Sequence, residues 1–204
     1  NLGVNTMIKN LLFVLISIFF TACSVNQVNV VSDEPKREEI TNKFIDEIGY
    51  ILFLLKRNDL NSLNAKFINP NYGVYEIYKT DIGNRIFYKH STSISAEQIS
   101  DLIESFEVKQ EEVTFNCSPY NDADYGWSKG GVFLTANIKP YLSNLIVATP
   151  QNQKEKEAEL KRISLIEKTS YELIITNNII FYLTKINGNW YITLIDNIKT
   201  DCSK

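Results

Sequence analysis

The spacing of apolar residues changes along this chain, and this change limits the folds open to it more than any other feature. Between residues 40 and 55 apolar side chains recur every three or four positions, which is the repeat of an amphipathic helix. Between residues 171 and 196 the repeat falls to two, which is typical of strands. Asn187-Gly188 separates the last two strand-like runs and favours a type I′ turn. The chain therefore combines a long N-terminal amphipathic helix with a C-terminal antiparallel meander.

The same signals predict further elements between these two regions. Runs of β-branched and aromatic residues on either side of a turn predict a hairpin, and Ser95 with Gln98 forms a capping box, which is typical of the start of a helix. Helices and hairpins that do not alternate regularly predict the α+β class, with helices packed on an antiparallel sheet. The predicted segments are helices 36–58, 59–67, 95–105, 137–148 and 153–168, strands 74–79, 85–90 and 113–117, a loop over 118–131, and final strands 171–176, 179–185 and 190–196.

An apolar run near the start of the chain has the pattern of a different kind of segment. Met7, the expected initiator, and Lys9 precede the run Leu11–Phe20, which is about half as long as a helix that crosses a bilayer. A positive start followed by a short apolar run and small residues is the layout of a secretory signal. The alternatives are a buried helix of the fold and an uncleaved anchor.

The end of this run, Phe20-Thr21-Ala22-Cys23, resembles the lipobox of bacterial lipoproteins, in which the cysteine receives a diacylglycerol and the peptide is cut just before it. Phe20 departs from the small aliphatic residue usual at its position, whereas Ala22 and Cys23 match. The resemblance implies a lipid-anchored protein of the bacterial cell envelope, on the outer membrane facing the periplasm. It implies a signal peptide over residues 1–22 that is removed and a lipidated Cys23, followed by a flexible tether over 23–35. The length of the remaining chain and its helix and strand patterns predict a single α+β domain over 36–204.

The order of elements carries a second, weaker resemblance. A long first helix and a last hairpin with the sequence INGNWYITLID are similar to the layout of cystatin-like and NTF2-like domains in small secreted bacterial proteins. The likeness covers the last third of the chain and the first long helix. It implies an architecture and no function, because unrelated functions occur on the same fold.

The lipobox resemblance affects how the three cysteines of the chain are interpreted. If Cys23 carries lipid, Cys117 and Cys202 remain as an even pair in an exported, oxidising setting, and we expect a disulfide between them. Two separately buried thiols are the alternative, because distance in space cannot be read from sequence. We expect no catalytic cysteine, since His90 is the only histidine and no nucleophile motif surrounds either residue.

The predicted loop over 118–131 contains the candidate contact residues. Asp122 and Asp124 have the spacing of an EF-hand start, but Gly126 and Phe133 stand where further oxygen ligands are required, so we expect no metal and no cofactor. Exposed tyrosine and tryptophan beside acids suit contact with a glycan or an envelope protein, and core packing of these rings is the alternative. The candidates are Tyr120, Asp122, Asp124, Tyr125 and Trp127.

The charge and the motifs narrow the classes of function. A net charge of −3 provides no basic footprint for nucleic acid. The chain contains no dinucleotide fingerprint, P-loop or G-x-S-x-G motif. We therefore expect a non-enzymatic binding or structural domain tethered to the membrane, with an envelope hydrolase that uses carboxylates as the alternative. A polar pocket in which two or more acids converge favours the hydrolase, and a flat aromatic patch favours binding.

Overall fold

A computed structural model describes the chain over residues 36–80, 85–95, 103, 105–117, 125–136, 141–149 and 152–202. All of these residues belong to one compact unit, Pro35–Lys204. The predicted signal peptide, Cys23 and the tether lie outside the described residues, as does most of the helix predicted to open at Ser95. No helix in the described part of the chain is long and apolar enough to cross a membrane.

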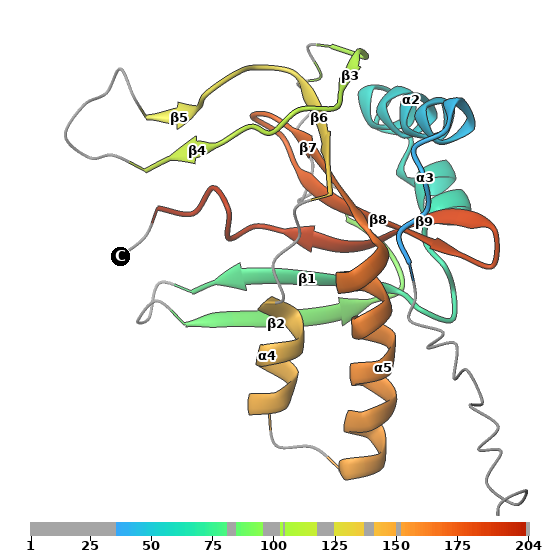
Figure 1. Ribbon diagram of the computed structural model, residues 1–204, viewed down its shortest axis with the longest axis vertical. Coiled ribbons are helices and arrows are strands. Elements are labelled where there is room, and N and C mark those ends of the chain that lie inside the picture. The colour runs from blue at the N-terminus through green and yellow to red at the C-terminus, as the bar shows by residue number, and fades with distance from the viewer. Residues whose placement is uncertain are drawn as a thin grey trace, which may run out of the picture. The chain divides into compact units, whose positions relative to one another are not determined.

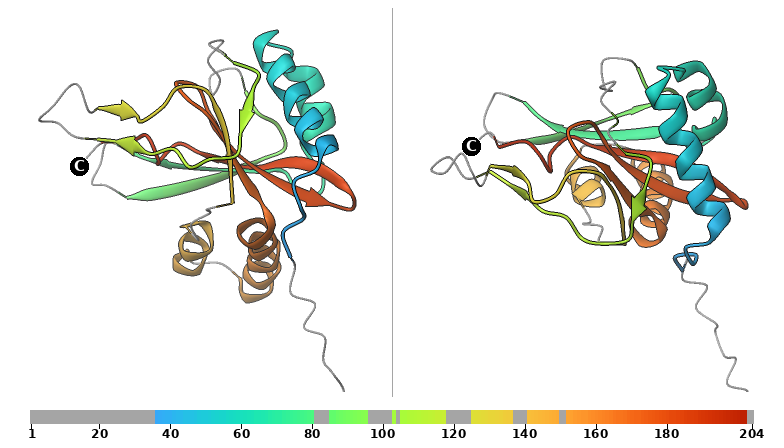
Figure 2. Two further views of the ribbon diagram at one scale, coloured as in Figure 1. Left: turned by 45° about the horizontal axis from the view of Figure 1, so that its top comes forward. Right: turned by 90° about the horizontal axis from the view of Figure 1, so that it is seen from above.

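Within this unit, helices cover both faces of a sheet, and the α+β class is confirmed (Figures 1 and 2). Helices α2 (Asn42–Lys56) and α3 (Leu60–Phe67) bury one core, and α4 (Tyr141–Ala148) and α5 (Gln153–Thr169) bury another on the opposite face. The central strands are therefore apolar on both sides, unlike those of a sheet with one wet face. The strands are β1 (Val74–Lys79), β2 (Ile86–Ser91), β3 (Val108–Lys109), β6 (Val132–Thr135), β7 (Tyr171–Ile175), β8 (Ile180–Ile186) and β9 (Asn189–Asp196).

The sheet runs in the order β2-β1-β9-β8-β7-β6-β3 among the described residues. The predicted meander β7-β8-β9 is confirmed, and Asn187 and Gly188 have the positive φ values, 51° and 85°, that a type I′ turn requires. The sheet is mostly antiparallel, as predicted, but β1 is parallel to β9 and β3 is parallel to β6. These pairs join segments far apart in the chain, and no local pattern encodes their direction.

The segment before α4 also differs from the prediction. Part of the loop predicted over 118–131 is a strand, β5 (Gly126–Trp127), which pairs with β4 (Phe115–Asn116) in a separate small sheet. Gly126 has a φ of 107°, a conformation that L side chains rarely adopt. Of the helix predicted over 137–148, the part that the structure describes, Tyr141–Ala148, is helical, and residues 137–140 lie outside the described residues.

Helix α2 occupies the stretch with the clearest helical spacing. Thr41 caps it, since the Thr41 Oγ1 accepts a hydrogen bond of 3.2 Å from the Phe44 N–H. The Phe44 ring stacks on Trp190 of β9, with ring centroids 3.7 Å apart. This contact joins the first helix to the last strand across the first core.

A β-bulge at Thr193 decides which way the end of β9 faces. Leu183 of β8 pairs with Ile192, while Tyr182 pairs with Leu194, so Thr193 is the extra residue. Ile192 accordingly lies in the core under α2 and α3, and Leu194 lies in the core under α4 and α5. Beyond the bulge, side chains at even-numbered positions of β9 therefore face α4 and α5 instead of α2 and α3.

The core contact of α2 leads to a stability prediction. We expect Phe44→Ala to lower the free energy of unfolding by about 3–5 kcal/mol, because it leaves a cavity beneath Trp190. Phe53 lies on the same helix but is 44% exposed, so Phe53→Ala should cost less than about 1 kcal/mol. Urea unfolding of the two variants measures both values, and similar losses would contradict the orientation of α2.

Candidate functional site

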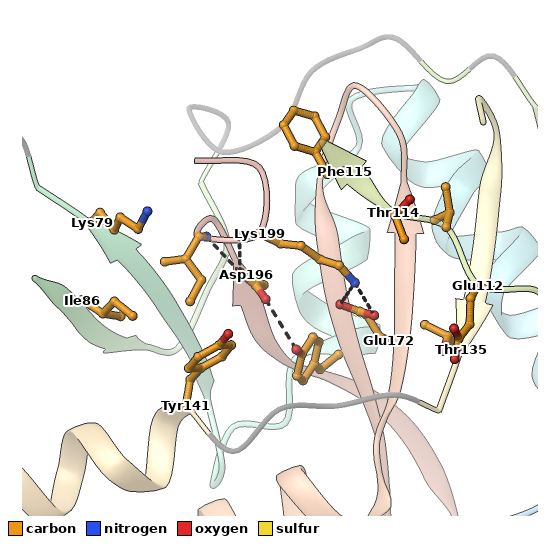
Figure 3. A pocket seen from close by; sticks show the side chains of 13 residues that line it. Lys79, Ile86, Glu112, Thr114, Phe115, Thr135, Tyr141, Glu172, Asp196 and Lys199 are labelled. Atoms are coloured by element: carbon orange, nitrogen blue, oxygen red, sulfur yellow. Dashed lines mark hydrogen bonds and ion pairs between the residues drawn. The ribbon is translucent and has the colours of Figure 1, made fainter. Parts of the chain in front are cut away.

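A pocket of about 450 Å³ opens on the face of the sheet that α4 and α5 cover, beside the first residue of α4 (Figure 3). Its floor crosses neighbouring strands, since Thr135 of β6 pairs with Glu172 of β7, and Glu172 pairs with Tyr182 of β8. Asp196 completes the floor from β9. Pockets of this size hold small molecules in many proteins.

Beyond the bulge at Thr193, Leu194 and Asp196 both face the side of α4 and α5. Without the extra residue, Asp196 would share the face of Trp190 and Ile192 and point into the other core. The bulge therefore brings a carboxylate into the pocket, which is a common use of bulges beside functional sites.

Glu172 and Lys199 form an ion pair in the floor. Glu172 is only 1% exposed, and the Lys199 Nζ lies 2.8 Å from each of its carboxylate oxygens. A buried carboxylate is costly unless it is paired and hydrogen-bonded, and this lysine supplies both. The pair contributes no net charge to the pocket.

Asp196 is held by three donors. Its Oδ1 accepts the backbone N–H groups of Ile198 at 2.9 Å and Lys199 at 3.0 Å, and its Oδ2 accepts the Tyr182 hydroxyl at 3.4 Å. Burial raises the pKa of Asp196 despite these donors, because removing the carboxylate from water disfavours its charged form. Burial also raises the pKa of Tyr182, and the negative charge of Asp196 adds to this effect. The hydroxyl of Tyr182 therefore keeps its proton.

A disulfide ties two walls of the pocket together. The predicted bond between Cys117 and Cys202 is present, with the two Cα atoms 5.3 Å apart. Cys117 follows the wall segment that contains Phe115, and Cys202 follows the segment that contains Lys199. The bond closes a sequence separation of 85 residues, for which chain entropy alone gives about 4.5 kcal/mol of stabilisation at most. The bond therefore stabilises the fold and also holds these two walls of the pocket together.

Of the contact residues predicted from sequence, the two that the structure describes lie beside this pocket rather than in it. Tyr120, Asp122 and Asp124 fall outside the described residues. Tyr125 is exposed, and Trp127 packs on the core beneath α4 and α5; neither lines the pocket. Both rings meet Phe115 edge-on, with centroid distances of 5.7 Å and 5.2 Å. Phe115 lines the pocket and so connects the predicted residues to it.

Sequence reasoning missed the residues of the floor. Glu172 and Asp196 are single acids within or at the end of otherwise apolar strands, YELII and NWYITLID. A charged side chain in a strand that is buried on both faces needs a partner of opposite charge or hydrogen-bond donors. An isolated acid in such a strand was therefore the signal from which the polar floor could have been predicted. His90 does not line the pocket; its Nε2 donates to the Tyr72 carbonyl at 2.7 Å. Among the described residues, no three His, Cys, Asp or Glu side chains gather as a metal site.

Comparison of the chain with protein-family models, with curated proteins and with solved structures finds no match. What the pocket does is therefore inferred from the residues that line it.

The buried Asp196 predicts a dependence of stability on pH. Because its pKa is raised, the folded state holds this proton more tightly than the unfolded state, so the free energy of unfolding falls as pH rises from the ordinary value of 3.8 towards the folded pKa. Asp196→Asn removes this contribution. Urea unfolding at several pH values between about 4 and 7 should show the variant gaining stability relative to the wild type as pH rises. A difference that does not change with pH would contradict the raised pKa.

Proposed function

We propose that this chain is a lipid-anchored binding protein of the bacterial cell envelope, whose pocket holds a neutral, hydroxyl-rich ligand such as a short glycan. The observation that carries the proposal is that the charged groups of the floor already have partners within the protein. Lys199 is paired with Glu172, and the oxygens of Asp196 accept hydrogen bonds from the Ile198 and Lys199 N–H groups and from the Tyr182 hydroxyl. An ionic ligand that binds to the floor would have to displace one of these partners, whereas a neutral one would not.

The lining supports a glycan among neutral ligands. Carboxylate and phenol oxygens in the floor offer acceptors to ligand hydroxyls. Phe115 and Tyr141 in the walls offer aromatic surfaces to the C–H faces of a sugar ring. Ile86, Val113 and Ile198 complete the apolar part of the lining. A mostly apolar pocket with a few placed polar groups is the usual form of a small-molecule site.

The lipid anchor is proposed from the sequence before the domain. Ala22-Cys23 follows a short apolar run in the order of a lipoprotein signal. The Cys117–Cys202 disulfide supports export, because such bonds persist in oxidising compartments such as the periplasm. The membrane is then the first partner of the chain, through the lipid on Cys23.

A glycan-cleaving hydrolase is the second candidate, and one observation favours it. Asp196 has a raised pKa and shares the pocket with a second buried acid, Glu172, and a carboxylic acid with a raised pKa suits proton donation to a leaving group. Both oxygens of Glu172 contact Lys199, however, so this carboxylate would have to break its ion pair to act as a base or nucleophile. Binding without cleavage therefore fits the pocket better.

A substitution that fills the pocket tests the proposal. Thr114 lies in the wall with its side chain exposed, and Thr114→Trp should obstruct the pocket without disturbing a core. We expect titration calorimetry with maltose and diacetylchitobiose to show binding of at least one sugar, with affinity reduced at least about tenfold in the variant, a loss of about 1.4 kcal/mol.

Thr92→Trp, at an exposed position outside the pocket, is the matched control and should bind as the wild type does. Equal binding by Thr114→Trp and the wild type, or no binding of either sugar, would contradict the glycan site. Cleavage of a sugar that is lost in Asp196→Asn would replace the proposal with the hydrolase.

The anchor is tested separately in a bacterial host. Expressed from Met7, the chain should incorporate labelled fatty acid and fractionate with membranes. Cys23→Ser should abolish the label and the accompanying mass increase, because no thiol remains to receive the lipid. Processing and fractionation that are unchanged in Cys23→Ser would show that the lipobox interpretation is wrong.

A further inference from the structure

Helix α2 turns an aromatic and basic surface away from the core. We call this surface the α2 patch, and it consists of Tyr50, Phe53, Lys56 and Arg57 on α2 with Phe106 beside them. Tyr50 is 39% exposed, and Phe53 and Phe106 are each 44% exposed. Figure 2 shows α2 and α3 together on one side of the sheet. Large exposed rings that cluster are a mark of an interaction surface.

A cation lies over each ring of the α2 patch. The Arg57 Cζ is 5.2 Å from the centroid of Phe53, and the Lys56 Nζ is 5.1 Å from that of Phe106. Lys66 of α3 lies 4.3 Å above Tyr50. This arrangement shields the ring faces in water while keeping charge at the surface.

The outward side of α2 is positive although the chain as a whole is acidic. It carries the exposed cations Lys43, Lys56 and Arg57 against one exposed acid, Asp46. At its border, Lys66 is neutralised by Glu47 at 3.1 Å. Glu107, next to Phe106 in the chain, is a further exposed acid. The excess of cations on this helix face contrasts with the net charge of −3 of the whole chain.

We infer that the α2 patch docks the domain on an anionic lipid bilayer. Aromatic rings concentrate at the membrane–water interface, and basic side chains near an anionic surface each contribute about 1 kcal/mol. A helix with these two kinds of residue on one side lies in the plane of the interface. At 1.5 Å per residue, the part of the patch between Tyr50 and Arg57 presents a contact about 12 Å long.

This inference rests in part on the lipid anchor of the proposed function: in an anchored domain, even a weak contact between the patch and the bilayer is enough to keep the domain on the membrane surface. Helix α2 begins at Asn42, only 19 positions after Cys23 in the chain, so it is the first described helix after the proposed anchor. A domain held that near a bilayer meets it at a high effective concentration. Contact of the patch with lipid is nevertheless independent of the anchor and can be measured without it.

The experiment uses residues 24–204, which lack the apolar run and the lipidated cysteine; both cores lie within Pro35–Lys204. Cosedimentation is measured with vesicles of phosphatidylcholine alone or mixed with phosphatidylglycerol. We expect binding to the mixed vesicles and little to the neutral ones. Phe53→Ser/Arg57→Ser should weaken it at least about fivefold, the equivalent of one basic contact.

Phe87→Ser/Arg85→Ser removes an exposed ring and a cation from the first hairpin and is the matched control. It should bind as the unsubstituted chain does, and both pairs should keep the urea midpoint because their sites are exposed. Equal loss in the two pairs, equal binding to neutral vesicles, or no binding would overturn the inference. A concentration-dependent dimer that only the α2 pair disrupts, without vesicle binding, would assign the patch to a second copy instead. None of these outcomes depends on whether Cys23 carries lipid.

Discussion

Strand β9 is buried on both faces and pairs with β1 on one side and β8 on the other, so its side chains have fixed directions. One extra residue at Thr193 reverses those directions for the last part of the strand. The pocket depends on this reversal. Asp196 enters the floor because of it, and the turn that follows places the backbone N–H groups of Ile198 and Lys199 on its carboxylate and the Lys199 amine on Glu172.

The bulge is supported by a chain of buried hydroxyls. The Thr193 Oγ1 lies 2.6 Å from that of Thr184, which lies 2.5 Å from the Ser170 Oγ, and Ser170 donates to the Ile166 carbonyl of α5. Each hydroxyl is fully buried and hydrogen-bonded, so this network leaves no unmet polar group in the middle of the sheet. A floor built on such strands is rigid, and rigid strands hold a binding site more precisely than loops do.

The two proposed surfaces lie on opposite layers of the unit. The pocket opens on the side of α4 and α5, whereas the α2 patch belongs to the layer of α2 and α3 (Figure 1). A domain that rested on a bilayer through α2 would therefore keep the pocket on its far side, accessible from the solvent. The layered arrangement makes an anchored position and an open binding site compatible.

Local patterns in the sequence determined most of the elements, because helical and strand repeats and turn residues act over a few positions. The type I′ turn at Asn187-Gly188 and the three final strands follow from such patterns, and the cysteine count indicated the disulfide. Only the tertiary structure decided that β1 lies parallel to β9 and that Glu172, Tyr182, Asp196 and Lys199 share one pocket. The reason is physical: these residues meet through strand pairing and a one-residue bulge, and a bulge changes the face of a side chain without leaving a signal in the apolar repeat.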